Sequence, residues 1–231
     1  MQTKPLQASD YRIRKLIGFL GLILPVILPI VQGDFFASIS HYYYGRLSAL
    51  LFIIILSAFG LFLISYKGYI KDPSTENISD DFLTNIAGFA VLVLVFIPTS
   101  CSGSSNEAIA LLCNNRDKVP LALFGHCNQN LNTIHLVSSG VFILCMGWMS
   151  RYKFTRSLHD PNIFIYKWCG NIVFIAVGLI ILFMLLEKYT SVTIPFKAHY
   201  VYVFETLAII PFGISWLIKG DAIDNIKSLM K

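Results

Sequence analysis

Apolar runs separated by short polar stretches make up most of this chain. A membrane-spanning helix needs about 20 mostly apolar residues, and six runs reach or approach that length. They cover about 16–31, 47–66, 82–98, 131–149, 163–186 and 200–218. The pattern therefore predicts an all-α, polytopic transmembrane helix bundle of about six spans, built as one domain over residues 1–231. The third run is the weakest of the six because it is short and contains Asn85.

Two prolines, Pro25 and Pro29, lie four residues apart in the first run. Each proline removes one backbone hydrogen bond from a helix. A carbonyl oxygen freed in this way needs another partner when the helix lies in lipid. We therefore expect neighbouring helices to cover the freed carbonyls of this span.

The composition excludes an ordinary soluble domain. The chain is 55% hydrophobic and 13% charged, whereas soluble domains carry about 25% charged residues. The missing charge is explained if lipid surrounds most of the surface. The net charge of +5 does not indicate nucleic-acid binding, because the basic residues lie at the ends of the apolar runs, as in membrane proteins.

The distribution of Lys and Arg predicts the orientation in the membrane. With the N-terminus inside, thirteen of the 18 basic residues lie in the two tails, in the loops after the second and fourth spans, and at the start of the fifth span. Cytoplasmic loops are enriched in Lys and Arg. We therefore expect both termini on the cytoplasmic side and residues 99–130 as an outer loop.

Three of the five cysteines lie in this outer loop, at Cys101, Cys113 and Cys127. On an oxidising face three thiols favour one disulfide with one thiol left over, and the spacing does not choose the pair. Ser104 and Glu107 form a capping box that predicts a short helix, so we expect the loop to cap the bundle. The cysteines lack the short paired spacing of a structural zinc site.

Polar groups gather on the predicted outer side. Glu205 is expected to be the only charged residue clearly inside a span, and such a residue is costly and often functional. Tyr202, three residues earlier, shares its helix face. We therefore expect a polar pocket in the outer leaflet that binds a lipid headgroup or another small ligand. The expected pocket residues are Glu205, His135, His41, Ser40 and Tyr202.

A second hypothesis makes the same region a metal-dependent intramembrane lipid hydrolase. Imidazole and carboxylate groups bind zinc, and the candidate ligands are His41, His135, His199 and Glu205. No His-Glu-x-x-His element is present, so the ligands would come from separate segments. A small transporter and a membrane interaction subunit are further alternatives, although the chain has no internal repeat of the kind found in many transporters. A structural reading also stands, in which Glu205 only hydrogen-bonds across helices. The cofactor, the ligand and the oligomeric state are not determined by the sequence.

Short motifs spread over nearly the whole chain carry a resemblance to a known family. The motifs are Ser38-Ile39-Ser40-His41-Tyr42-Tyr43-Tyr44, Tyr66-Lys67-Gly68-Tyr69, Asn85-Ile86-Ala87-Gly88, Ile97-Pro98-Thr99, Ile134-His135 and Phe212-Gly213-Ile214-Ser215-Trp216-Leu217-Ile218-Lys219-Gly220. In these motifs the chain resembles a family of bacterial six-helix membrane proteins known only as a domain of unknown function. The resemblance implies six helices and a multi-pass location in a bacterial cytoplasmic membrane, and it implies no activity. The three cysteines of the outer loop lie outside the motifs.

Overall fold

The computed structural model describes residues 8–74, 76–101, 109, 113, 124–157, 159–190 and 198–221. Within these residues the fold is all-α and contains no strand, as predicted. The α-helices are α1 (Ala8–Gln32), α2 (Leu47–Ser65), α3 (Asp80–Phe96), α5 (Gln129–Trp148), α6 (Ile163–Tyr189) and α7 (Tyr200–Lys219). A 3-10 helix, η1 (Ile39–Tyr44), precedes α2, and a π-helical segment, η2 (Met149–Lys153), continues α5.

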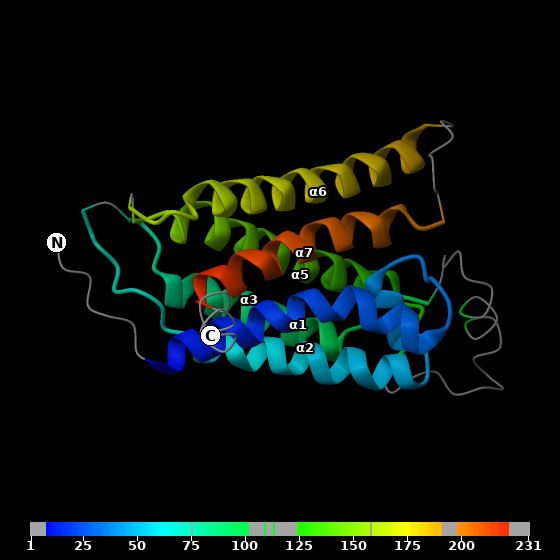
Figure 1. Cartoon of the computed structure of the whole chain (residues 1–231). Helices are drawn as coiled ribbons and strands as arrows, with labels where there is room; N and C mark the ends of the chain where they lie inside the picture. The colour runs from blue at the N-terminus through cyan, green and yellow to red at the C-terminus, as the bar shows by residue number, and fades with distance from the viewer. Residues whose placement is uncertain are drawn as a thin grey trace.

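The α-helices run alternately in opposite directions through one bundle (Figure 1). The start of α1 and the end of α7 lie together, where Arg14 Nη1 donates a hydrogen bond to the Lys219 carbonyl at 3.0 Å. We call this the terminal end, and it includes the connections 66–79 and 154–162. The opposite end carries η1 and the segments 97–101, 124–128 and 198–199, and we call it the pocket end.

Five helices are long and apolar enough to cross a membrane, which confirms a multi-pass membrane protein. They are Asp10–Gln32, Leu47–Ser65, Gln129–Lys153, Ile163–Tyr189 and Tyr200–Lys219. The remaining expected span, the third along the chain, corresponds to α3. Its 17 residues extend over about 26 Å, less than the roughly 30 Å of a hydrocarbon core. A complete crossing by α3 stays a prediction.

Glycines bring neighbouring backbones close together at two helix interfaces. A methyl group on Gly88 of α3 would lie 2.7 Å from the carbonyl oxygen of Gly60 in α2. Likewise, a methyl group on Gly18 of α1 would lie 2.8 Å from the carbonyl oxygen of Gly213 in α7. Such small-residue contacts are the usual basis of helix packing in lipid, where apolar burial alone does not drive association.

Helices α5 and α6 are close together at the terminal end and diverge toward the pocket end (Figure 1). A methyl group on Gly147 would lie 2.9 Å from Val173, and one on Gly170 would lie 2.5 Å from Arg151. At Gly140 of α5, nearer the pocket end, the same methyl group would meet nothing within 4 Å. The two helices therefore leave space between them in the half of the bundle that carries η1.

One of the two carbonyls freed by the prolines of the first span has a partner on a neighbouring helix. Pro29 has no N–H to donate to the carbonyl oxygen of Pro25, four residues earlier. The Tyr202 hydroxyl of α7 donates to that oxygen at 2.5 Å. A neighbouring helix thus replaces the missing backbone bond, as the prolines of the first span predict.

Candidate functional site

A pocket of about 820 Å³ lies between η1 and the helices α5, α6 and α7. Its polar lining residues are Ser38, Ser40, His41, Thr99, Ser100, Asn132, His135, Ser139, Glu187, Tyr200 and Glu205. Its apolar lining is mostly from α5 and α6: Leu136, Val137, Gly140, Ile143, Leu144, Val177, Ile180, Ile181 and Met184. Because Ile143 follows His135 by eight residues, the apolar lining extends about 12 Å from the histidine along α5 toward the terminal end.

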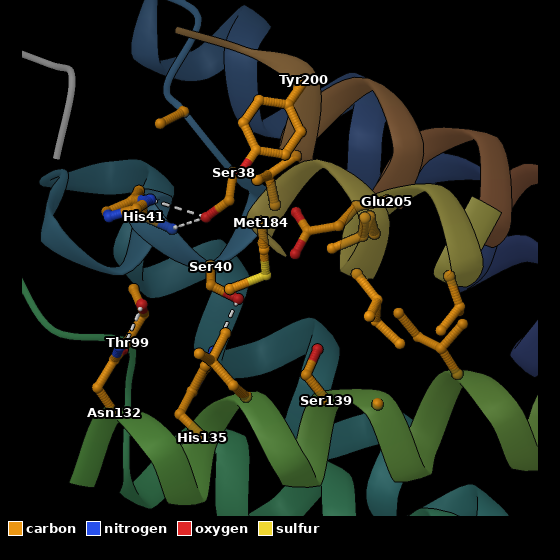
Figure 2. Close-up of a pocket in the computed structure, with 18 of the residues that line it drawn as sticks. Ser38, Ser40, His41, Thr99, Asn132, His135, Ser139, Met184, Tyr200 and Glu205 are labelled. Carbon is orange, nitrogen blue, oxygen red and sulfur yellow. Dashed lines mark hydrogen bonds between the residues drawn. The ribbon is translucent and has the colours of Figure 1, made fainter. Parts of the chain in front are cut away.

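The short helix η1 presents its serine and histidine side chains to this pocket (Figure 2). Ser38 caps η1, because its hydroxyl accepts a hydrogen bond from the backbone N–H of His41 at 3.2 Å. The Tyr42 ring stacks on Phe36 at 4.7 Å, and the Tyr44 hydroxyl donates to the Thr99 carbonyl at 2.5 Å. The Tyr44 contact fixes η1 against the segment that follows α3.

His135 connects α5 to η1 and to the end of α3. Its Nδ1 lies 2.8 Å from the Ile97 carbonyl oxygen, which can only accept a hydrogen bond, so the neutral ring carries its proton on Nδ1. Its Nε2 is therefore an acceptor, and the Ser40 hydroxyl donates to it at 2.9 Å. Both residues are buried, with His135 1% and Ser40 8% exposed.

His41 forms a second pair with a serine on the same short helix. Its Nδ1 lies 2.8 Å from the Ser38 hydroxyl oxygen. Burial, with a smaller contribution from the neighbouring His135, lowers the pKa of His41 to about 4. The His41 imidazole is therefore neutral at physiological pH.

Glu205 of α7 reaches η1 from the opposite wall of the pocket (Figure 2). Its Oε2 accepts a hydrogen bond from the backbone N–H of Ile39 at 2.6 Å, and the residue is 8% exposed. The carboxylate thereby holds the start of η1 against α7. Four of the five expected pocket residues, Glu205, His135, His41 and Ser40, line this one pocket.

The fifth expected residue, Tyr202, does not line the pocket. Its hydroxyl donates to the Pro25 carbonyl of α1. The sequence pattern predicted that Tyr202 shares a helix face with Glu205, but it did not predict the direction of the tyrosine side chain. The pattern did not single out the polar lining residues Thr99 and Asn132. Asn132 lies three residues before His135 on the same face of α5, and that spacing was the available signal.

The four candidate zinc ligands, His41, His135, His199 and Glu205, are not brought together as a metal site. His199 Nδ1 lies 3.4 Å from the Phe36 carbonyl oxygen, and the residue does not line the pocket. Within the part of the chain that the structure describes, the one group of three or more ligand-type residues with close ligand atoms is Cys101, Cys113 and Cys127.

The predicted disulfide joins Cys101 to Cys113, with Cα atoms 5.7 Å apart. The Cys127 sulfur lies 2.9 Å from that of Cys101 and is the remaining thiol of the three. The backbone N–H of Cys101 donates to the His126 carbonyl at 3.0 Å, which connects the two ends of the loop. The predicted capping-box helix at Ser104 and Glu107 falls outside the described residues.

A second polar cluster lies at the terminal end, and it corrects one expectation. Arg14 is buried within the candidate span Asp10–Gln32, so Glu205 is not the only charged residue within a span. Lys153 and Lys219, also buried, are the last residues of the spans Gln129–Lys153 and Tyr200–Lys219. Arg14 donates to the Tyr66 hydroxyl from Nε at 3.0 Å and from Nη2 at 2.6 Å. Lys219 Nζ pairs with an Asp160 carboxylate oxygen at 2.6 Å.

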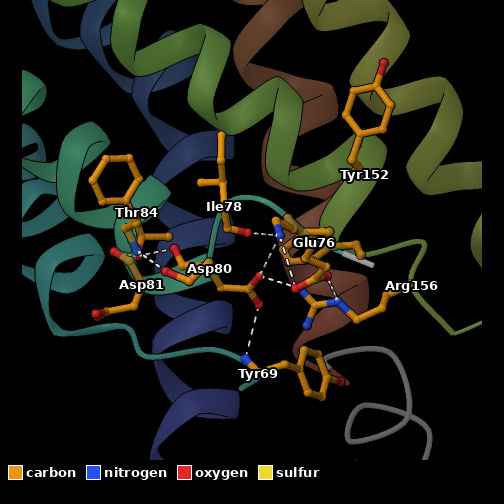
Figure 3. A network of polar contacts seen from close by, with 12 residues as sticks. Tyr69, Glu76, Ile78, Asp80, Asp81, Thr84, Tyr152 and Arg156 are labelled. Atoms are coloured by element: carbon orange, nitrogen blue, oxygen red, sulfur yellow. Dashed lines mark hydrogen bonds and ion pairs between the residues drawn. The ribbon is translucent and has the colours of Figure 1, made fainter. Parts of the chain in front are cut away.

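The same cluster joins the start of α3 to the segment after η2 through Asp80 (Figure 3). Asp80, 1% exposed, pairs with Arg156 Nη2 at 2.6 Å and accepts from the backbone N–H of Tyr69 at 3.1 Å. Glu76 pairs with Arg156 Nε at 2.5 Å, and Lys153 Nζ lies 3.4 Å from Glu76 and 3.9 Å from Asp80. Opposite charges are matched here, which is typical of a structural connection between helix ends.

Comparisons of this chain with protein-family models, with curated proteins and with solved structures gave no match. The resemblance to a bacterial six-helix family therefore stays a prediction from short motifs. The multi-pass helical architecture and the geometry of the pocket come from the chain's own structure.

Proposed function

We propose that this protein binds a single amphipathic lipid in the pocket at its pocket end. The observation that carries the proposal is the division of one cavity of about 820 Å³ into a polar part at η1 and an apolar part between α5 and α6. The volume lies within the range of about 300–1,000 Å³ that is usual for small-molecule sites. The polar head of a lipid matches the polar part of this cavity, and the apolar chain of the lipid matches the apolar part.

The apolar part of the pocket opens toward the bilayer. Val137 of α5 and Ile181 of α6 both line the pocket, and they are 60% and 53% exposed on the surface of the bundle. In a membrane these exposed faces contact lipid chains. A lipid can therefore enter sideways, between the diverging helices, without leaving the membrane.

The chemistry of the polar part favours a neutral or amine-bearing headgroup. Among the described residues that line the pocket, none is Lys or Arg, whereas Glu187 and Glu205 are carboxylates. A phosphate group would find no cation there to balance its charge. A headgroup with hydroxyls and an ester, as in a monoacylglycerol, can hydrogen-bond to the serine, asparagine and histidine side chains.

The location that we propose is a bacterial cytoplasmic membrane, with the pocket end on the non-cytoplasmic side. The excess of Lys and Arg in the tails and in the loops of the terminal end supports that end as cytoplasmic. The Cys101–Cys113 disulfide lies at the pocket end, and disulfides persist in oxidising compartments. The bacterial assignment rests on the motif resemblance.

The experiment compares Gly140→Trp with Gly178→Trp. Neither position has an atom within 4 Å of an added methyl group, but only Gly140 is among the residues that line the pocket. Lipids extracted from each purified protein are identified by mass spectrometry, and binding of a fluorescent monoacylglycerol is titrated in nanodiscs.

We expect the wild type and Gly178→Trp to retain the same lipid and to bind the probe equally. Gly140→Trp should lose the co-purified lipid and bind at least tenfold more weakly, because its indole occupies the apolar part of the pocket. Unchanged binding in a folded Gly140→Trp protein would reject the pocket as the lipid site.

A further inference from the structure

Ser40 and His135 form a hydrogen-bonded pair of the type that activates a serine nucleophile. The Ser40 hydroxyl donates to His135 Nε2 at 2.9 Å, within the range of about 2.6–3.2 Å expected between a nucleophile and its base. The other ring nitrogen is held by the Ile97 carbonyl oxygen at 2.8 Å. A third group thus fixes the tautomer and the orientation of the base, which is the role of the orienting residue in serine hydrolases.

Local helix capping accounts for the neighbouring pair but not for this one. Ser38 and His41 are three residues apart, and Ser38 also accepts the backbone N–H that begins η1. Ser40 and His135 are separated by 95 positions, and Ser40 caps no helix end. Both members of the long-range pair line the pocket, so a ligand in the pocket can contact them.

Asn132 adds a side-chain amide to the same wall of the pocket. Its Oδ1 accepts hydrogen bonds from Thr99 Oγ1 at 3.1 Å and from the Ser100 backbone N–H at 2.9 Å. These bonds orient the amide, and the –NH2 group is its donor end. A side-chain amide of this kind can stabilise the oxyanion of acyl transfer.

We propose that the protein is a serine acyl hydrolase that acts on ester-linked lipids, with Ser40 as nucleophile and His135 as general base. The inference rests on the proposed lipid binding and assigns a reaction to the same pocket. Ser40 Oγ forms a bond to the ester carbonyl carbon while its proton moves to His135 Nε2. The carbon–oxygen bond to the leaving alcohol then breaks, and His135 returns the proton to that alcohol.

The acyl-Ser40 intermediate is resolved by water. The water oxygen bonds to the acyl carbonyl carbon while His135 Nε2 accepts a proton from that water. The bond to Ser40 Oγ then breaks, the serine regains its proton, and the fatty acid leaves. No oxidant, reductant or metal is needed for the balance of this sequence.

The experiment uses a fluorophosphonate probe, which phosphonylates activated serines, on the full-length protein in nanodiscs. The labelled peptide is mapped by mass spectrometry in the wild type and in Ser40→Ala, His135→Gln and Ser65→Ala. Ser65→Ala is the matched control. Ser65 is an exposed serine whose hydroxyl donates to the Leu61 carbonyl, and it does not line the pocket. Release of fatty acid from a monoacylglycerol is measured on the same samples.

We expect labelling at Ser40 in the wild type and in Ser65→Ala, and none in Ser40→Ala. Because general-base catalysis contributes about 10²–10⁴-fold, His135→Gln should label and hydrolyse at least a hundredfold more slowly. His135→Gln must first be shown to retain its melting temperature and its co-purified lipid. A wild-type protein that retains lipid but is not labelled at Ser40 would overturn the hydrolase and leave the lipid-binding proposal intact. Labelling at Ser40 without retained lipid would support the nucleophile and reject the proposed lipid binding.

Discussion

The Tyr202 hydroxyl donates to the carbonyl oxygen of Pro25 at 2.5 Å and so joins α7 to α1 across the bundle. The oxygen needs this donor because Pro29 cannot supply the usual helical N–H. The Tyr202 hydroxyl and the two prolines therefore depend on one another. This hydrogen bond also keeps Tyr202 out of the pocket, although its neighbour Glu205 faces it.

Tyr202→Phe should lower the stability of the folded protein by about 1 kcal/mol, because a buried carbonyl loses its partner. The change is measured as a shift of thermal unfolding in detergent. Pro29→Ala restores the backbone donor, so Tyr202→Phe should cost much less in that background. Equal losses in both backgrounds would show that the hydroxyl does not serve the freed carbonyl.

Asp80 and its neighbour Asp81 provide a matched test of the terminal cluster. Asp80→Asn should destabilise by the order of 3 kcal/mol, because it leaves Arg156 and Lys153 with reduced compensation in a buried site. Asp81 pairs with Lys67 at 3.4 Å, but their side chains are 41% and 75% exposed. Asp81→Asn should therefore change stability by less than about 1 kcal/mol. Similar unfolding temperatures for the two variants would contradict the structural role of Asp80.

The lowered pKa of His41 gives a prediction of how the stability of the folded protein depends on pH. Burial lowers its pKa from 6.5 to about 4 in the folded protein, so between these values the unfolded state binds more protons than the folded state. Stability should therefore be highest above about pH 6.5 and fall as the pH drops toward 4, by at most ~1.4 kcal/mol per pH unit from this group. Unfolding temperatures of the wild type and His41→Gln, recorded from pH 7.5 to 4, should diverge at low pH.

The pocket also contains His135, Glu187 and Glu205, and these groups remain in both proteins of that comparison. Their titration contributes to the pH dependence of each, so the difference between the two curves reports on His41. Parallel curves over the whole range would show that His41 is not held neutral by the fold.

The three clustered cysteines give a prediction about pairing. Cys127→Ser should leave the Cys101–Cys113 disulfide intact, and Cys113→Ser should allow Cys101 to pair with Cys127, because those sulfurs lie 2.9 Å apart. Peptide mapping without reduction distinguishes these bridges. A Cys101–Cys127 bridge as the main species in the wild type would contradict the observed pairing.

The apolar runs were sufficient to predict the multi-pass helical bundle, because burial in lipid imposes a length and a composition on each span. The apolar run begins at about residue 16, after Arg14 and Lys15, so it does not predict that α1 begins at Ala8. That arginine is accommodated in the helix by Tyr66 and by the Lys219 carbonyl, which lie 52 and 205 positions away. No local pattern reports partners at such separations.

The candidate site was predictable in its side-chain types and not in its contacts. Histidines and Glu205 on one side of the membrane indicated a polar pocket, and four of the expected residues line it. The partners of His135 and Glu205 are the Ile97 carbonyl and the Ile39 N–H. Backbone groups carry no sequence signature, so the tautomer of His135 and the direction of Glu205 needed the three-dimensional structure.

Helix α6 packs closely against α5 at Gly147 and against its continuation η2 at Gly170. The distance between the helices at Gly140 depends on the angle at which they cross at this close contact. Neither glycine lines the cavity, so the space between the helices also depends on contacts that lie outside the pocket. If the pocket binds a lipid as proposed, a larger residue at Gly147 or Gly170 should change the length of the acyl chain that fits, while every side chain around His135 stays the same.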